Sequence, residues 1–137
     1  MKLRKILILT LFMISPITSF AQKAYEMVEY NSTVNGMVVK LSLADGYLVA
    51  SKITLISKNK KESIFNPENG VADNNGKLKF IPYTSPLKPA KPYFFLSGLR
   101  DSFGVIPLTI SGKYYDGNKQ YSLIFKKKNK LWAKKLF

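Results

Sequence analysis

The sequence predicts an all-β protein that folds as a single antiparallel β-sandwich of about seven to eight strands, after a cleaved signal peptide. Three observations predict this class. Apolar and polar residues alternate in short runs, turns rich in glycine and asparagine separate the runs, and helical periodicity is scarce. The pattern is typical of an antiparallel sandwich or a small barrel. The chain has 137 residues, which is the length of one domain.

Alternation and turn residues define the first half of the strand pattern. Val39, Leu41 and Leu43 share one face of a run, with polar residues mostly on the other face. Asp45 and Gly46 then provide a tight turn, and Pro67 ends the fourth run. The first four expected strands span residues 25 to 30, 37 to 43, 47 to 57 and 62 to 66.

The second half has the clearest turn of the chain. Asn75 and Gly76 suit a turn with positive φ, and Leu78 and Phe80 alternate with polar neighbours directly after it. Residues 82 to 92 contain four prolines, which predicts a loop. Pro107 indicates a kinked or edge strand. The last four expected strands span residues 77 to 81, 93 to 99, 103 to 115 and 119 to 126.

Residues 1 to 21 have the layout of a secretory signal peptide. Lys2 and Arg4 give a positive start, an apolar run follows from Ile6 to Ile14, and Ser19 and Ala21 form the cleavage site. An uncleaved membrane anchor is the alternative, but the apolar run is too short to span a bilayer comfortably. We therefore expect export to the periplasm, the cell surface or the medium. The expected domains are the signal peptide at 1-21, the β-sandwich at 22-127 and a basic C-terminal tail at 128-137.

The charge of the chain is strongly positive and uneven. The formal net charge is +14, and residues 113 to 137 carry eight lysines against the single acid Asp116. Such a field attracts anionic partners such as phosphorylated lipid or acidic polysaccharide. Nucleic acid is disfavoured because Arg100 is the only arginine after residue 21, and arginine is preferred for bidentate contacts. The alternative is that the lysines only coat a solvated surface.

The composition excludes much catalytic chemistry. The chain has no histidine and no cysteine, which removes histidine-dependent triads, histidine zinc sites and iron–sulfur centres. Ser85 and Lys88 fit an S-x-x-K pattern, but Pro89 disfavours the helical turn that this pattern needs. Residues 73 to 76 do not complete a calcium loop, because Lys77 follows where a ligand is needed. We therefore expect no enzyme activity, no catalytic residues, no metal site and no cofactor.

Two segments carry a family resemblance. Residues 41 to 55, LSLADGYLVASKITL, and 69 to 82, NGVADNNGKLKFIP, resemble bacterial immunoglobulin-like and transthyretin-like (carboxypeptidase regulatory-like) extracellular β-sandwich domains. Asp73, Asn75, Gly76 and Phe80 match the second family segment, while Ala72 replaces its usual threonine. The resemblance implies an immunoglobulin-like or transthyretin-like sandwich and a non-catalytic binding module. It implies no functional residues.

Three functions follow from these patterns. The first is an exported, non-catalytic β-sandwich that acts as a binding or accessory protein of the bacterial cell envelope, with an unknown protein or an anionic envelope component as its partner. The second is binding of a polyanion or an anionic membrane face through the lysine-rich end of the chain. The third is an inhibitor or immunity-type protein that binds another protein through residues 82 to 92.

The lysine-rich end supplies the candidate site. A short amphipathic helix there would place a tryptophan at the membrane interface and lysines at anionic head groups. Docking of the apolar residues of the tail on the body is the alternative. The candidate contacts are Lys126, Lys127, Lys128, Lys130, Trp132, Lys134 and Lys135.

Overall fold

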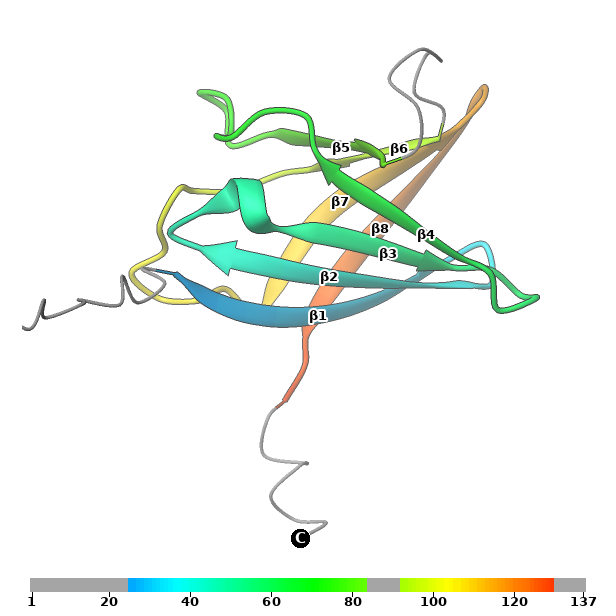
Figure 1. Ribbon diagram of the computed structural model, residues 1–137, viewed down its shortest axis with the longest axis horizontal. Coiled ribbons are helices and arrows are strands. Elements are labelled where there is room, and N and C mark those ends of the chain that lie inside the picture. Colours follow the sequence, from blue (N-terminus) through cyan, green and yellow to red (C-terminus); the bar gives the residue numbers. More distant parts are fainter. Residues whose placement is uncertain (1–24, 84–91, 130–137) are drawn as a thin grey trace, which may run out of the picture.

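The computed structural model describes residues 25 to 83 and 92 to 129, and these residues form eight antiparallel strands (Figure 1). The expected signal peptide lies outside the described residues. The elements are β1 (Glu26–Val34), β2 (Met37–Asp45), the short 3-10 helix η1 (Leu48–Ala50), β3 (Lys52–Ile56), β4 (Glu62–Pro67), β5 (Leu78–Pro82), β6 (Tyr93–Leu96), β7 (Thr109–Asp116) and β8 (Lys119–Lys127).

The strands form a closed barrel. Each strand pairs with the next along the chain, and β1 pairs with β8 through Tyr30–Lys127 and Asn31–Lys126. The predicted all-β class is confirmed, but the predicted β-sandwich is wrong. Alternation and turn residues are the same in a sandwich and in an up-and-down barrel. Pairing between the first and last strands distinguishes the two folds, and no local pattern encodes this pairing.

Turns predicted from the sequence have the expected backbone. Gly76 has φ of +73°, and the Asp73 carboxylate accepts hydrogen bonds from the backbone N–H groups of Asn75 and Lys77 at 2.9 and 2.8 Å. Gly46, in the predicted turn after Asp45, has φ of +92°. In the turn between β1 and β2, Asn35 and Gly36 have positive φ as well. These side chains and glycines fix the turns locally.

Two expected strands begin later than predicted. The strand expected from residue 47 starts at Lys52, because Leu48–Ala50 form a helical turn and the buried Ser51 hydroxyl accepts the Ala44 N–H at 2.9 Å. The strand expected from residue 103 starts at Thr109. Pro107 therefore lies in the loop before β7, where its carbonyl accepts the Tyr30 hydroxyl at 2.7 Å. A hydrogen bond within the β2–β3 connection outweighs local alternation at the first place, and a hydrogen bond to the distant strand β1 does so at the second.

Inward-facing side chains fill the barrel. Phe80, Phe94 and Tyr114 occupy facing positions on β5, β6 and β7. The Phe65 ring meets the Phe94 ring edge-on at 4.9 Å, and Phe94 lies 4.7 Å from Tyr114. An eight-stranded barrel is just wide enough for side chains to fill it. The largest fully buried residues are Tyr30, Phe65, Phe80, Phe94, Phe125, Leu41, Leu43, Leu48, Ile53, Leu96 and Val39.

Gly112 on β7 allows this packing. A Cβ atom at this position would lie 2.8 Å from Cδ2 of Leu96 and 3.3 Å from Cε2 of Phe125. We expect Gly112→Ala to lower the free energy of unfolding by about 1–3 kcal/mol, since a methyl group overpacks the core. Gly104→Ala is the matched control, because no atom lies within 4 Å of its Cβ position. Urea unfolding of both variants tests this, and equal stabilities would contradict it.

Burial of Tyr114 makes the fold sensitive to alkali. Burial first, and then the charges of Asp116 and Tyr121, raise the pKa of Tyr114 from 10.0 to about 12. A raised pKa favours the neutral phenol in the folded state, so its contribution is complete below pH 10 and is lost as the pH rises through 12.

We expect the free energy of unfolding to fall between pH 10 and 12, and to fall less in Tyr114→Phe than in the unchanged protein. Tyr30 contributes in the same direction, because burial and then Asp45 raise its pKa. Urea unfolding across this range measures both effects. The same pH dependence in Tyr114→Phe would show that this phenol is not responsible.

Candidate functional site

The filled interior directs the search for a site to the outer surface. Tyr30, Phe65, Phe80, Phe94 and Phe125 have at most 1% of their surface exposed. Their rings occupy the space that a barrel of this size offers to a small ligand. In the part of the chain that the structure describes, surface hollows lie over the β1–β8 seam, at the rim of the barrel and beside the β4–β5 loop.

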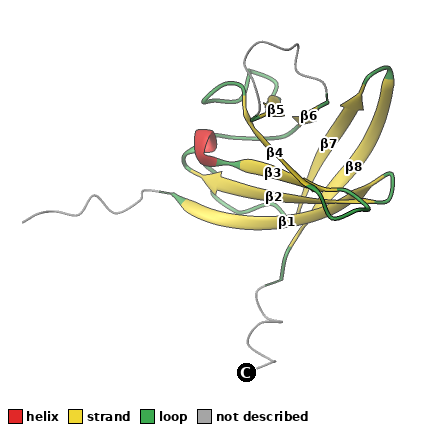
Figure 2. Cartoon of the chain, turned by 45° about the vertical axis from the view of Figure 1, so that its right-hand side comes forward, coloured by secondary structure: helices red, strands yellow, loops and turns green. Residues whose placement is uncertain are grey.

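The seam between β1 and β8 is only partly closed. After the pairs Tyr30–Lys127 and Asn31–Lys126, the ladder ends. The Ser32 hydroxyl donates to the Ile124 carbonyl at 2.8 Å, at the position where the next backbone hydrogen bond would be expected. Beyond it the strands diverge. The tip of the β7–β8 hairpin and the β1–β2 turn lie well apart in both views (Figures 1 and 2).

A groove of about 450 Å³ lies over this seam, and we call it the seam groove. The residues that line it are Asn31, Ser32, Thr33, Val38, Lys40, Ile124 and Lys126. They come from β1, β2 and β8, and together they combine lysine ammonium groups, short polar side chains and exposed apolar surface. Val38 and Ile124 are 42% and 55% exposed.

Strand register places two lysines on either side of one asparagine. Asn31 is paired with Lys40 on β2 and with Lys126 on β8. The Cα atoms of the lysines are therefore two strand spacings apart, roughly 10 Å. The lining residues include no carboxylate. The nearby carboxylate of Glu29 accepts a hydrogen bond from the Ser42 hydroxyl. The seam groove therefore presents two cations with polar and apolar surface between them.

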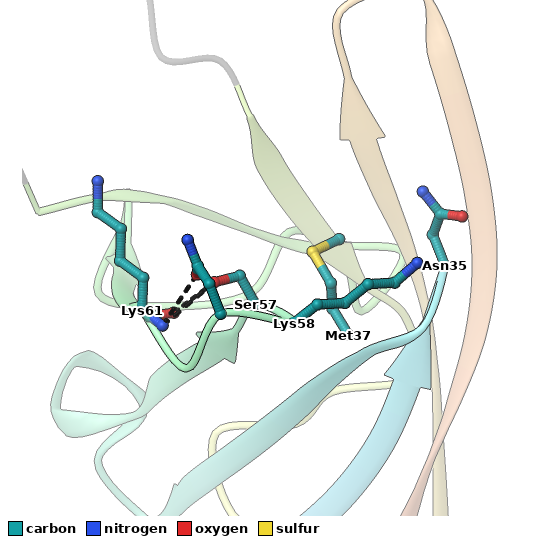
Figure 3. Close-up of a pocket in the computed structure, with 6 residues that line it drawn as sticks. Asn35, Met37, Ser57, Lys58 and Lys61 are labelled. Atoms are coloured by element: carbon teal, nitrogen blue, oxygen red, sulfur yellow. Dashed lines mark hydrogen bonds between the residues drawn. The ribbon is translucent and has the colours of Figure 1, made fainter.

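A second cationic hollow lies at the rim, between the β1–β2 and β3–β4 turns (Figure 3). Its volume is about 550 Å³, and it is lined by Asn35, Met37, Ser57, Lys58, Asn59 and Lys61. Lys58 extends over the β1–β2 turn toward Asn35 (Figure 3). A Cβ atom on Gly36 would lie 2.7 Å from Cε of Lys58, so the glycine makes room for this side chain.

The turn that carries these rim lysines is held by its own polar groups. The Lys61 backbone N–H donates to the Ser57 hydroxyl and to the Asn59 amide oxygen, at 3.2 Å each (Figure 3). Lys60 adopts positive φ. These contacts account for the shape of the turn without a ligand.

An aromatic cluster covers the outside of β5, β6 and β7. Tyr93 stacks on Tyr115 at 4.7 Å, and the Phe95 ring lies edge-on to both tyrosines. The Lys79 ammonium lies 4.5 Å from the centre of the Tyr93 ring. The rings are half-buried against one another, so the cluster has a structural role as cross-strand pairs. Phe95 also borders the hollow beside the β4–β5 loop.

The sequence-predicted contacts are only partly described. Lys126 and Lys127 end β8, and Lys128 follows it. Of these, Lys126 lines the seam groove. The backbone N–H groups of Lys127 and Lys128 donate to the carbonyls of Leu108 and Glu29, so the backbone is fixed as far as Lys128. The remaining contacts, Lys130, Trp132, Lys134 and Lys135, lie outside the described residues.

Sequence reasoning missed the other half of the groove. Lys40 alternates with Val39 and Leu41, which indicates an outward-facing side chain. Nothing local predicts that Lys40 and Lys126 face the same asparagine, since that depends on barrel closure.

The described residues also bear on metal binding and membrane spans. Among residues 25 to 83 and 92 to 129, no three acidic side chains gather as metal ligands would. In the same ranges, no helix has the length and apolar character needed to pass through a bilayer.

Comparison with known proteins gives no relative. No protein-family model, curated protein or solved structure matches the chain. The immunoglobulin-like and transthyretin-like resemblance is therefore limited to the turn-containing segments that suggested it.

Proposed function

We propose that this protein is an exported, non-catalytic binding protein of the bacterial cell envelope, which holds an anionic partner on the outer surface of its barrel. The observation that carries the proposal is the seam groove, where Lys40 and Lys126 flank Asn31 and no carboxylate is among the lining residues. The filled interior supports an external site, because buried aromatic side chains occupy the space inside the barrel where a ligand could otherwise bind.

The chemistry of the groove suits an extended anionic ligand. Two ammonium groups that face one groove attract negative charge, while Asn31, Ser32 and Thr33 offer hydrogen bonds. Val38 and Ile124 provide exposed apolar surface for the uncharged part of the ligand. Both lysines are exposed, so each contributes modestly and the attraction weakens with salt.

The remaining elements of the proposal come from the sequence. The pattern of residues 1 to 21 supports export. The lysine-rich end continues from the groove, since Lys126 lies in it and Lys127 and Lys128 follow directly. An anionic ligand in the seam groove therefore lies close to the start of the predicted basic tail. The inhibitor hypothesis depends on a loop of which residues 84 to 91 lie outside the described residues, and it adds nothing to this proposal.

We expect the protein to bind fluorescent polygalacturonate at low ionic strength, and Lys40→Gln combined with Lys126→Gln to weaken this binding about tenfold. The matched control is Lys52→Gln combined with Lys113→Gln. It removes the same charge from exposed positions on β3 and β7 that do not line the groove. Fluorescence anisotropy measures the dissociation constants.

Salt and neutral probes complete the experiment. Binding should fall steeply between about 0.05 and 0.5 M salt, and neutral dextran should not bind. Anionic vesicles of phosphatidylglycerol, tested in parallel, distinguish a membrane surface from a soluble polymer. Equal losses in both double variants would mean that only the net charge matters. No salt-sensitive binding to either anionic probe would refute the proposed function.

A further inference from the structure

Among residues 25 to 83 and 92 to 129, no strand pairs with one edge of β8 over most of its length. The β7–β8 ladder is continuous from Asp116–Lys119 to Thr109–Lys126. The β1–β8 ladder, by contrast, contains only Tyr30–Lys127 and Asn31–Lys126. On the β1 side, residues 120 to 124 of β8 therefore lie beyond the end of the ladder. This edge borders the seam groove, since Ile124 lines it.

The hairpin geometry identifies the backbone groups on this edge. Gly117 and Asn118 form a two-residue turn, so Asp116 and Lys119 are the first hydrogen-bonded pair of the hairpin. In antiparallel pairing, alternate residues direct their N–H and C=O groups to opposite sides. The backbone groups of Gln120, Ser122 and Ile124 consequently point toward β1. In the described part of the chain, β1 pairs with none of these residues.

This edge is exposed and has little protection. Gln120, Ser122 and Ile124 are all exposed, and the segment between them contains no proline. Ser32 covers a single backbone group of this edge, because its hydroxyl donates a hydrogen bond to the Ile124 carbonyl. Exposed strand edges are usually blocked by charge, proline or a covering segment, because unpaired backbone groups bind other strands. Here the charges lie at the ends of the edge, at Lys119 and Lys126.

We propose that the β8 edge from Gln120 to Ile124 binds an extended, acidic segment of a partner polypeptide as an added antiparallel strand. The inference rests on the proposed function, because it names the chemical class of the anionic partner. Five residues of strand span about 17 Å, and addition of a strand to a free edge is an established mode of peptide recognition.

Charge selects both the partner and its orientation. An antiparallel segment begins beside Lys126 and Lys40 and ends near the β7–β8 turn, where Asp116 and Lys119 are paired in register. Acidic side chains are therefore favoured at the amino-terminal end of the segment. A second copy of this chain is disfavoured as the occupant, because both copies are strongly positive and repel each other. The formal net charge is +14 for the full sequence, and only three of these charges lie in residues 1 to 21.

The test uses labelled peptides of about seven residues, long enough to cover the free edge. One peptide begins with two glutamates and continues with alternating threonine and valine. A second has the same side chains with alternate backbone amides N-methylated, and a third has glutamine in place of glutamate. We expect the first peptide to bind, and the second and third to bind about five- to tenfold more weakly, because they lose backbone hydrogen bonds or charge.

Protein variants separate strand addition from simple charge attraction. Ser122→Pro removes the N–H that faces the free edge and leaves the β7–β8 ladder intact. It should therefore weaken binding of the first peptide about five- to tenfold, whereas Ser122→Ala should leave this binding unchanged. If Ser122→Pro does not fold, amide hydrogen exchange of the unchanged protein replaces it. The peptide should then protect the N–H groups of Gln120 and Ser122.

The outcomes distinguish this inference from the proposed function. If N-methylation has no effect and the peptide protects neither amide, strand addition is wrong. Polygalacturonate binding that depends on Lys40 and Lys126 would then still support the anionic site. Failure of the acidic peptide to bind while polygalacturonate binds also overturns the inference alone. If the acidic peptide, polygalacturonate and the anionic vesicles all fail to bind, the proposed function is overturned as well.

Discussion

The short ladder between β1 and β8 is the interaction on which the rest of the structure depends. Two residue pairs close the barrel, and backbone hydrogen bonds from Lys127 to Leu108 and from Lys128 to Glu29 secure the same corner. The Tyr30 hydroxyl ties this corner to the loop before β7 through the Pro107 carbonyl. Because the barrel is closed, strands surround each inward-facing aromatic ring, and the rings pack into a core that needs no disulfides.

Because the same ladder stops early, it leaves the seam groove, where we propose that the partner binds. Had the pairing continued past Asn31 and Lys126, β8 would have no free edge and the two strands would not diverge. The barrel thus combines a closed, filled interior with one incompletely closed seam. Lys40 and Lys126 lie where closure ends, so the cations and the free backbone groups belong to one continuous surface. Stability comes from the interior of the barrel, whereas we propose that binding takes place on its outer surface.

Much of the local structure was predictable. In the Asn75–Gly76 turn, Gly76 has the positive φ that glycine allows. Val39, Leu41 and Leu43 share the buried face that their alternation indicated. Predictions failed where specific hydrogen bonds override local alternation. The Ala44–Ser51 bond holds the connection between β2 and β3, and the Tyr30–Pro107 bond joins the loop before β7 to the distant strand β1. These connections replaced the expected starts of two strands.

The sequence by itself determined the all-β class, the approximate strand order, the positive charge and the absence of histidine and cysteine chemistry. These properties follow from composition and from preferences that act within a few residues. Only the tertiary structure decided that the strands close into a barrel, and that Lys40 and Lys126 flank Asn31. Strand pairing between the two ends of the chain depends on how a whole sheet twists and curls, and alternation within each strand is the same whether the sheet closes or not.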